Sequence, residues 1–183
     1  QKMESVTDPI QVEGSPRAVA ITDDGKKVYV ALGGNAGVAV IDTAENRVIK
    51  TIETGADPWG MELKYPNLYV SNEGLASISV IDVRNDKVVN EVITSDTPRG
   101  IAYLNGMIYV SVMNGVDVFE TKRFEKPASM GLDYVVYDAA YAKTSSGNKI
   151  YIAGYDKGSA TGKIAVIDPE VNEVVSEVDV DGW

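Results

Sequence analysis

Two arginines and a tryptophan occupy one recurring position of the sequence, and they are the side chains best suited to bind a ligand. Arg17, Trp59 and Arg99 each follow a proline, and in the fourth repeat we expect Asp138 at this position. A guanidinium pairs with carboxylates and phosphates, and an indole ring stacks on aromatic groups and cations. If these positions meet in space, they predict a site for anionic or aromatic groups or for a partner. The alternative is that they only pack against neighbouring strands.

A second candidate is the longest irregular stretch between predicted strands, residues 155–162. Long loops on a rigid scaffold often carry function. Its candidate binding residues are Asp156, Lys157, Ser159 and Thr161. No Gly-Lys-Ser/Thr follows Gly158 at the spacing of a phosphate-binding loop, so the stretch does not predict a nucleotide site of that type.

The chain contains no histidine and no cysteine. This excludes a disulfide, a thiolate nucleophile, a cysteine-bound zinc ion and a histidine-dependent triad. Asp42, Asp82 and Asp168 recur once per repeat, which disperses them too widely to surround one metal ion, and we expect them to hold turns. We therefore predict no catalytic residue, no metal and no cofactor.

These candidates lie in a sequence that repeats about every 40 residues. Tyr29, Tyr69, Tyr109 and Tyr151 stand in similar runs of valine and isoleucine, spaced by 40, 40 and 42 residues. Short β-type runs at this period are typical of propeller blades, each a sheet of four antiparallel strands. We predict an all-β fold of about four blades. Their approximate ranges are residues 13–54, 55–94, 95–137 and 138–180.

Three details of this prediction are less regular. An extra outer strand is expected at residues 5–12, before the first blade. The outer strand of the third blade has two candidate positions, residues 122–130 and residues 132–137. Four tyrosines are expected in the core and between blades, namely Tyr134, Tyr137, Tyr141 and Tyr151.

Both ends of the repeated region carry an outer-type strand, at residues 5–12 and 173–180. A ring closed by strand exchange needs only one of them, so one strand is surplus. The sequence therefore predicts an open arc and not a closed four-bladed ring. Either the arc is part of a larger propeller, or a protein partner or further copies of the chain complete the ring.

The repeat resembles the YVTN β-propeller repeat of archaeal and bacterial cell-surface proteins, which is related to lactonase-type propellers. Glu120 departs from the pattern, because aspartate is expected there. The resemblance is carried by residues 27–30 (KVYV), 69–72 (YVSN) and 40–43 (VIDT) with Asn46. It implies a propeller fold and an extracellular or cell-envelope location.

The net charge of −10 and the scattered lysines and arginines argue against a nucleic-acid partner. No apolar run approaches the roughly 20 residues of a transmembrane helix. We expect a non-catalytic scaffold for protein–protein interaction, adhesion or self-assembly, as in a surface layer or filament. Two alternatives stay open. The resemblance to lactonase-type propellers implies a hydrolase or the propeller subunit of a larger enzyme, and a ligand-binding sensor is the other.

Overall fold

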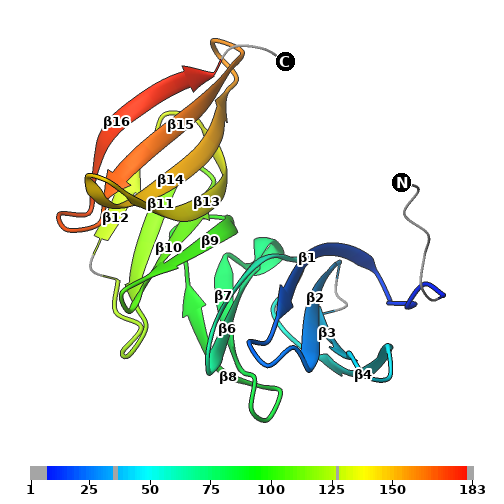
Figure 1. Ribbon diagram of the computed structural model, residues 1–183. Helices are drawn as coiled ribbons and strands as arrows, with labels where there is room; N and C mark the ends of the chain where they lie inside the picture. The colour runs from blue at the N-terminus through cyan, green and yellow to red at the C-terminus, as the bar shows by residue number, and fades with distance from the viewer. Residues whose placement is uncertain (1–7, 35–36, 127, 181–183) are drawn as a thin grey trace, which may run out of the picture.

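The computed structural model describes residues 8–34, 37–126 and 128–180 (Figure 1). Its strands form four separate antiparallel sheets of four strands each, arranged along an open arc. Each sheet runs in chain order from one edge to the other, as propeller blades do. The predicted all-β architecture of four blades is therefore confirmed.

The first two blades follow the repeat closely. Blade one consists of β1 (Ser15–Ile21), β2 (Lys27–Gly33), β3 (Gly37–Asp42) and β4 (Arg47–Ile52). Blade two consists of β5 (Pro58–Lys64), β6 (Asn67–Asn72), β7 (Ser77–Asp82) and β8 (Lys87–Ile93), with a single 3-10 turn, η1 (Glu73–Leu75), between β6 and β7.

The last two blades differ more from each other. Blade three consists of β9 (Pro98–Leu104), β10 (Met107–Val112), β11 (Gly115–Glu120) and the short β12 (Ala128–Gly131). Blade four consists of β13 (Val135–Thr144), β14 (Gly147–Asp156), β15 (Thr161–Asp168) and β16 (Glu173–Val180).

Burial explains which strands are apolar on both faces. The second and third strands of blades one to three are almost wholly buried, because each is covered by residues from neighbouring elements on both sides. The outer strands β4 and β8 expose most of their residues and turn Ile52 and Val92 inward. The hydrophobic core therefore lies in layers between successive blades, and a blade at the end of the arc has one layer missing.

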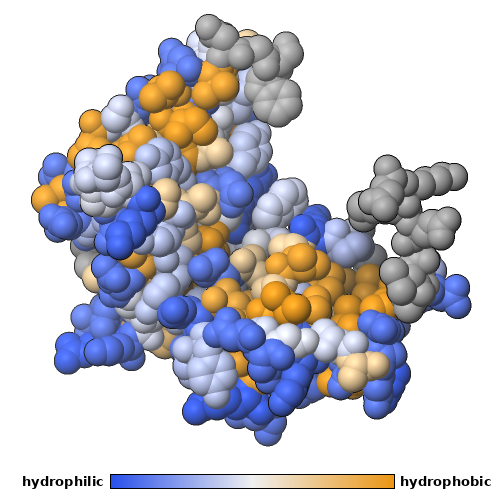
Figure 2. Space-filling view, viewed as in Figure 1, coloured by the Kyte–Doolittle hydropathy of each residue, from blue (hydrophilic) through white to orange (hydrophobic). Residues whose placement is uncertain are grey.

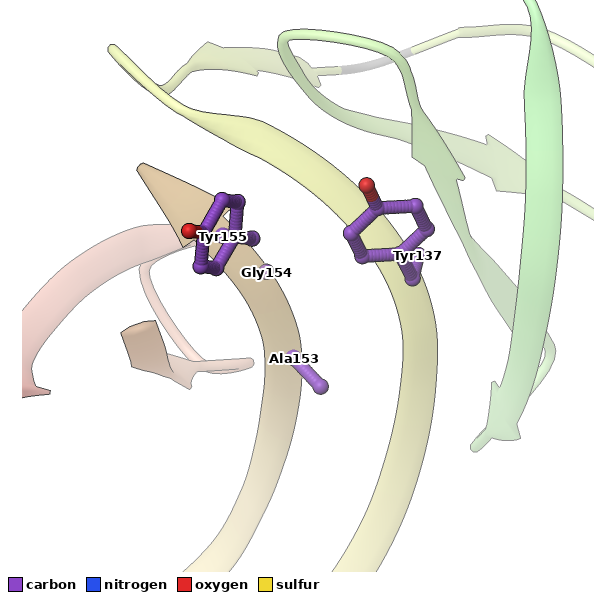
Figure 3. A pocket seen from close by; sticks show the side chains of 4 residues that line it. All are labelled: Tyr137, Ala153, Gly154 and Tyr155. Carbon is purple, nitrogen blue, oxygen red and sulfur yellow. The ribbon is translucent and has the colours of Figure 1, made fainter. Parts of the chain in front are cut away.

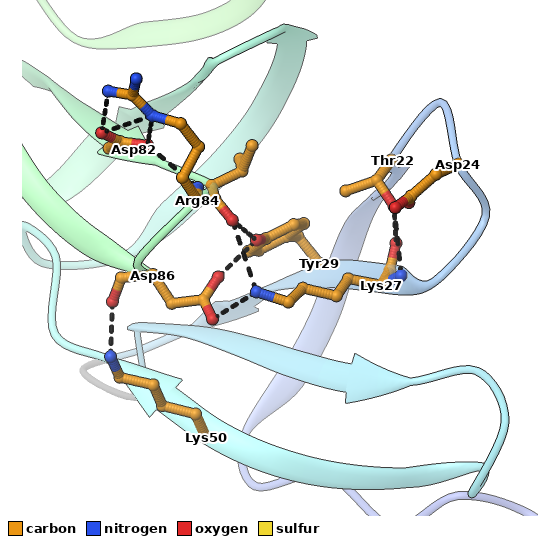
Figure 4. Close-up of polar contacts among 9 residues, drawn as sticks. Thr22, Asp24, Lys27, Tyr29, Lys50, Asp82, Arg84 and Asp86 are labelled. Atoms are coloured by element: carbon orange, nitrogen blue, oxygen red, sulfur yellow. Dashed lines mark hydrogen bonds and ion pairs between the residues drawn. The ribbon is translucent and has the colours of Figure 1, made fainter.

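In blades one and three the hydroxyl of the repeated tyrosine forms a hydrogen bond to the next blade. Tyr29 is fully buried, and its hydroxyl donates a hydrogen bond of 2.5 Å to Oδ1 of Asp86 in the third turn of blade two (Figure 4). Lys27 Nζ lies 2.6 Å from Oδ2 of the same carboxylate. The hydroxyl of Tyr109 donates equivalently to Oδ1 of Asn172 in blade four, at 2.9 Å. A polar clamp thus closes the edge of the apolar layer.

Replacing Tyr29 by phenylalanine tests this clamp. The variant loses a buried hydrogen bond to a charged group, so we expect its free energy of unfolding to fall by about 1.5 kcal/mol in urea denaturation at neutral pH. Tyr65→Phe is the control, because Tyr65 is 62% exposed. If both variants are equally stable, the clamp contributes nothing.

The clamp also predicts a loss of stability in alkali. Burial, and then the bond to Asp86, raise the pKa of Tyr29 well above its ordinary value. The unfolded chain therefore releases this proton near pH 10, while the folded chain still holds it. The contribution of the Tyr29 hydroxyl to the free energy of unfolding is complete below about pH 10. It is lost as the pH rises through the pKa of Tyr29 in the folded state. We expect a shallower alkaline loss of stability in Tyr29→Phe than in the wild type.

Three predicted boundaries need correction. Residues 8–12 are not in a strand, and residues 5–7 lie outside the described residues. The outer strand of blade three is β12, so only the end of the candidate range 122–130 is correct. Residues from Val135 onward belong to β13, the innermost strand of blade four, so the expected boundary between residues 137 and 138 falls inside that strand.

The innermost strands approach each other so closely that only small residues fit between them. A Cβ on Gly60 would lie 2.3 Å from the backbone oxygen of Arg99, and a Cβ on Gly100 would lie 2.5 Å from the Cα of Asp138. These glycines let β5, β9 and β13 pack side by side. The residues that start these strands are therefore brought together.

Candidate functional site

Four side chains from the four innermost strands form one row, which we call the inner stack: Arg17, Trp59, Arg99 and Tyr137. The Cζ atom of Arg17 lies 4.3 Å from the centre of the Trp59 ring, and that of Arg99 lies 5.3 Å from the same ring. Arg99 also lies over the Tyr137 ring, at 4.9 Å. Cations and aromatic rings thus alternate from blade one to blade four, and each contact is within cation–π range.

One carboxylate holds both arginines of the inner stack. Glu73, in η1, accepts a hydrogen bond from Nη1 of Arg17 at 3.2 Å and from Nη2 of Arg99 at 2.8 Å. Asp57 lies 3.0 Å from Nη2 of Arg17. Since both guanidiniums already have carboxylate partners, an anionic ligand would have to compete with Glu73 and Asp57.

The structure brings the three predicted residues together but replaces the fourth. Asp138 was expected to continue the row, and Tyr137 continues it instead. Strands β1 and β13 carry the same β-bulge, and Val136 pairs with Gly154 as Pro16 pairs with Leu32, so Val136, and not Asp138, takes the place of the proline. Asp138 pairs with Ala153 as Ala18 pairs with Ala31, so the bulged residue Tyr137 takes the position of Arg17. The expectation that Tyr137 and Tyr141 lie in the core is wrong, because their exposed fractions are 41% and 42%.

Glu73 and Asp57 were not predicted as site residues. Neither lies on a strand, and each comes from a segment just outside the repeated strand motif. The inner-stack residue precedes the repeated tyrosine by 12, 10, 10 and 14 residues in the four blades, so no fixed spacing identifies Tyr137 from the sequence. No signal in the sequence pointed to Glu73.

Two cavities adjoin the inner stack. The first, of about 340 Å³, is lined by Arg17, Trp59, Tyr137 and Asp138 among others, so it carries both a cation and a carboxylate. The second, of about 620 Å³, is lined by Tyr137, Ala153, Gly154 and Tyr155 on blade four and is mainly apolar (Figure 3). Tyr137 belongs to both.

The predicted loop site is smaller than expected. Strands β14 and β15 extend to Asp156 and from Thr161, which leaves residues 157–160 as a turn. Asp156 accepts hydrogen bonds from the Gly158 amide at 2.7 Å and the Ser159 hydroxyl at 2.5 Å. The Ser159 bond, followed by the Gly158 amide, lowers the pKa of Asp156. These groups bond to one another within the turn, and Lys157 is exposed beside them.

The three repeated aspartates hold turns, as predicted. Oδ1 of Asp42, Asp82 and Asp168 accepts a hydrogen bond from a backbone amide two residues further along, at 2.8–2.9 Å. In Asp82 the side chain of Arg84 also binds the carboxylate and lowers its pKa to about 2. Each aspartate therefore stabilises the turn between the third and fourth strands of its blade.

Substituting Glu73 tests the electrostatics of the inner stack. Glu73→Gln removes the charge that both arginines share, and its side chain is only 18% exposed. We expect the free energy of unfolding to fall by about 1.5 kcal/mol in urea, and by less in high salt. Glu45→Gln is the control, since Glu45 pairs with Arg47 at the surface and should contribute less than about 0.5 kcal/mol. Equal losses in both variants would contradict a shared anchor.

Comparison with known proteins gives the fold. No protein family and no curated protein matches the chain. Among solved structures, Kuenenia stuttgartiensis hydrazine synthase is similar with a TM-score of 0.82 and 21% identity, over 98% of this chain and 53% of that chain. The dihydro-heme d1 dehydrogenase NirN in complex with DHE has a TM-score of 0.74 and 14% identity, over 94% of this chain and 39% of that chain.

The β-propeller domain of Myceliophteria thermophila Cps50 (Swd1) is also similar, with a TM-score of 0.72 and 12% identity, over 94% of this chain and 58% of that chain. At these identities the likeness shows a β-propeller fold and nothing finer. The chain spans less than two thirds of each of these structures. Within its described residues, no helix is long and apolar enough to cross a membrane.

Proposed function

We propose that the chain is a non-catalytic β-propeller arc that acts as a protein-interaction scaffold through the two faces at its ends. The observation that carries this proposal is the outer face of blade four. Val178 occupies the place on β16 that Ile52 occupies on β4, since their partners across the sheet are Ile164 and Val38. Ile52 is 5% exposed under blade two, whereas Val178 is 52% exposed.

We call the apolar surface around this position the blade-four end face, made by Tyr137, Tyr155, Val178 and Val180. Figure 2 shows hydrophobic residues gathered on blade four and on the β1–β2 side of blade one. On blade one, Val19 is 71% and Ile21 is 58% exposed. Contiguous apolar surface of this kind marks an interaction site in a folded protein.

An extracellular or cell-envelope location, in a surface layer or filament, is part of the proposal. It is supported by the resemblance of residues 27–30 and 69–72 to the YVTN repeat. A lactonase-type hydrolase and a ligand sensor have less support. The arginines at the inner stack already bind Glu73 and Asp57, and no further observation favours a substrate there.

Light scattering at increasing protein concentration tests the scaffold proposal. We expect the average mass to rise with concentration without a discrete oligomer, because the apolar blade-four end face stays uncovered in a single molecule and associates weakly when its partner is missing. The double variant Val178→Asp, Val180→Asp should abolish this rise, since charge on the face opposes its burial. Val89→Asp is the control, because Val89 is 55% exposed on the outer strand of an interior blade. A wild-type chain that stays monomeric throughout would overturn the proposal.

A further inference from the structure

The inner stack ends on an aromatic ring with one face uncovered. Arg99 lies between two rings, whereas Tyr137 has a cation on one side only and is 41% exposed. The 620 Å³ cavity lies against it. From blade one to blade four, each blade contributes one member of the inner stack, from the start of its innermost strand. A blade packed on blade four in the same way would therefore place a side chain against the Tyr137 ring.

The chemistry of that side chain follows from its surroundings. The negative face of an aromatic ring attracts a cation. The carboxylate of Asp138, which lines the neighbouring cavity with Tyr137, favours a positive charge and disfavours a negative one. The alternation Arg17, Trp59, Arg99, Tyr137 continues with a cation. An arginine or a lysine is thus the expected next member.

At the other end of the arc, residues 8–12 also indicate that a blade is missing. Along residues 9–13 exposure alternates, and Ile10 and Val12 turn inward. Both pack against a cluster of buried hydrophobic residues on the face of blade one that points away from blade two. The cluster consists of Val30, Leu32, Ala39 and Ile41. Ile10 precedes Pro16 by the same number of residues as Ile52 precedes Pro58. Residues 8–12 thus lie where the outermost strand of a preceding blade would lie.

This second observation excludes a full copy of the chain as the neighbour of blade one. Blade four already has its own outermost strand, β16. If a copy packed its blade four on blade one, Val178 of that copy would need the place that Ile10 occupies. The neighbour that fits is a blade of three strands, which leaves its fourth place to residues 8–12.

We propose that the ring is completed by a set of propeller blades that differ from this chain at both ends. Their first blade places an arginine or lysine over the free face of Tyr137. Their last blade has three strands and takes residues 8–12 as its fourth. This inference rests on the proposed function, because it names the partner that the end faces bind.

Trimmed versions of the chain's own blades provide the probe. Residues 13–120 and residues 13–168 both begin with the blade that carries Arg17 and end after a third strand, so each lacks an outermost strand. Each is co-expressed with the tagged full chain, and the mass of the purified complex is measured. We expect a discrete 1:1 complex with at least one of them, and no discrete 1:1 complex between two untrimmed chains.

Variants of the full chain test the contact with Tyr137. Tyr137→Leu should weaken the 1:1 complex about tenfold, and Arg17→Met in the trimmed partner should do the same. Tyr137→Trp should keep the affinity. Tyr141→Leu is the matched control, because Tyr141 is 42% exposed on the same strand and lies outside the inner stack. Ile10→Asp should weaken the complex at the other end.

Three results would overturn the inference. One is that neither trimmed partner co-purifies with the full chain. Another is equal binding by Tyr137→Leu and Tyr141→Leu. The third is a discrete dimer of untrimmed chains that depends on Tyr137, which would make a copy the partner. If self-association in light scattering persists while any of these is found, this inference fails and the scaffold proposal stands.

Discussion

Replacing Gly100 by valine is expected to separate blade three from blade four. A Cβ at this position would lie 2.5 Å from the Cα of Asp138 and 2.6 Å from the backbone nitrogen of Ala139. Both atoms belong to the backbone of β13 and cannot move aside as a side chain could. We expect the free energy of unfolding to fall by at least about 3 kcal/mol and the Tm to fall by about 10 °C, measured by circular dichroism.

Gly131→Val is the control for this prediction. Gly131 also lies in a strand, but nothing lies within 4 Å of its added Cβ. Valine suits an extended backbone, so its effect should stay within about 0.5 kcal/mol. If Gly100→Val melts as late as Gly131→Val, the innermost strands do not pack as closely as the structure shows.

Replacing Asp117 by alanine is expected to cause the second large loss. The Asp117 carboxylate is fully buried in blade three. It accepts hydrogen bonds from the Ser95 amide at 2.6 Å, the Ser95 hydroxyl at 2.9 Å and the Ser129 hydroxyl at 2.7 Å, and Lys126 lies 3.5 Å away. Alanine leaves these donors without their acceptor. We expect the free energy of unfolding to fall by about 3 kcal/mol in urea.

Asp156→Ala serves as the comparison. Asp156 accepts similar bonds from a backbone amide and a serine hydroxyl, but in an exposed turn where water can replace it. The free energy of unfolding of Asp156→Ala should fall by only about 0.5 kcal/mol. Similar losses in the two variants would mean that burial does not decide the contribution of Asp117.

The sequence predicts the blades because one physical constraint repeats along it. Each blade must bury its second and third strands on both faces, so Tyr29, Tyr69 and Tyr109 stand in similar apolar runs. The same repeat places Arg17, Trp59 and Arg99 at equivalent starts of innermost strands. Their meeting follows from blade geometry alone.

The parts that the sequence does not predict depend on local exceptions. Blade four has Val136 where blade one has Pro16, so no proline marks Tyr137 as the member of the inner stack, although β1 and β13 carry the same β-bulge. Glu73 reaches both arginines from the 3-10 turn η1, the one 3-10 element among the described residues, and the repeat does not predict it. Residues 8–12 keep the side-chain alternation of an outer strand but have no blade to pair with, so they are not a strand.

The central claim is that four blades form an open arc whose ends do not meet. The chain has no cysteine, so Val19→Cys and Val178→Cys introduce two unique labelling sites, one on each end face. The distance between spin labels at these sites can be measured by pulsed electron resonance. Val19 lies on an innermost strand and Val178 on an outermost strand, so in a closed ring one sheet spacing and three strand spacings would separate them by about 17 Å, and the account predicts a distance far beyond this value. A distance near that value in the monomer would show a closed four-bladed ring and contradict it.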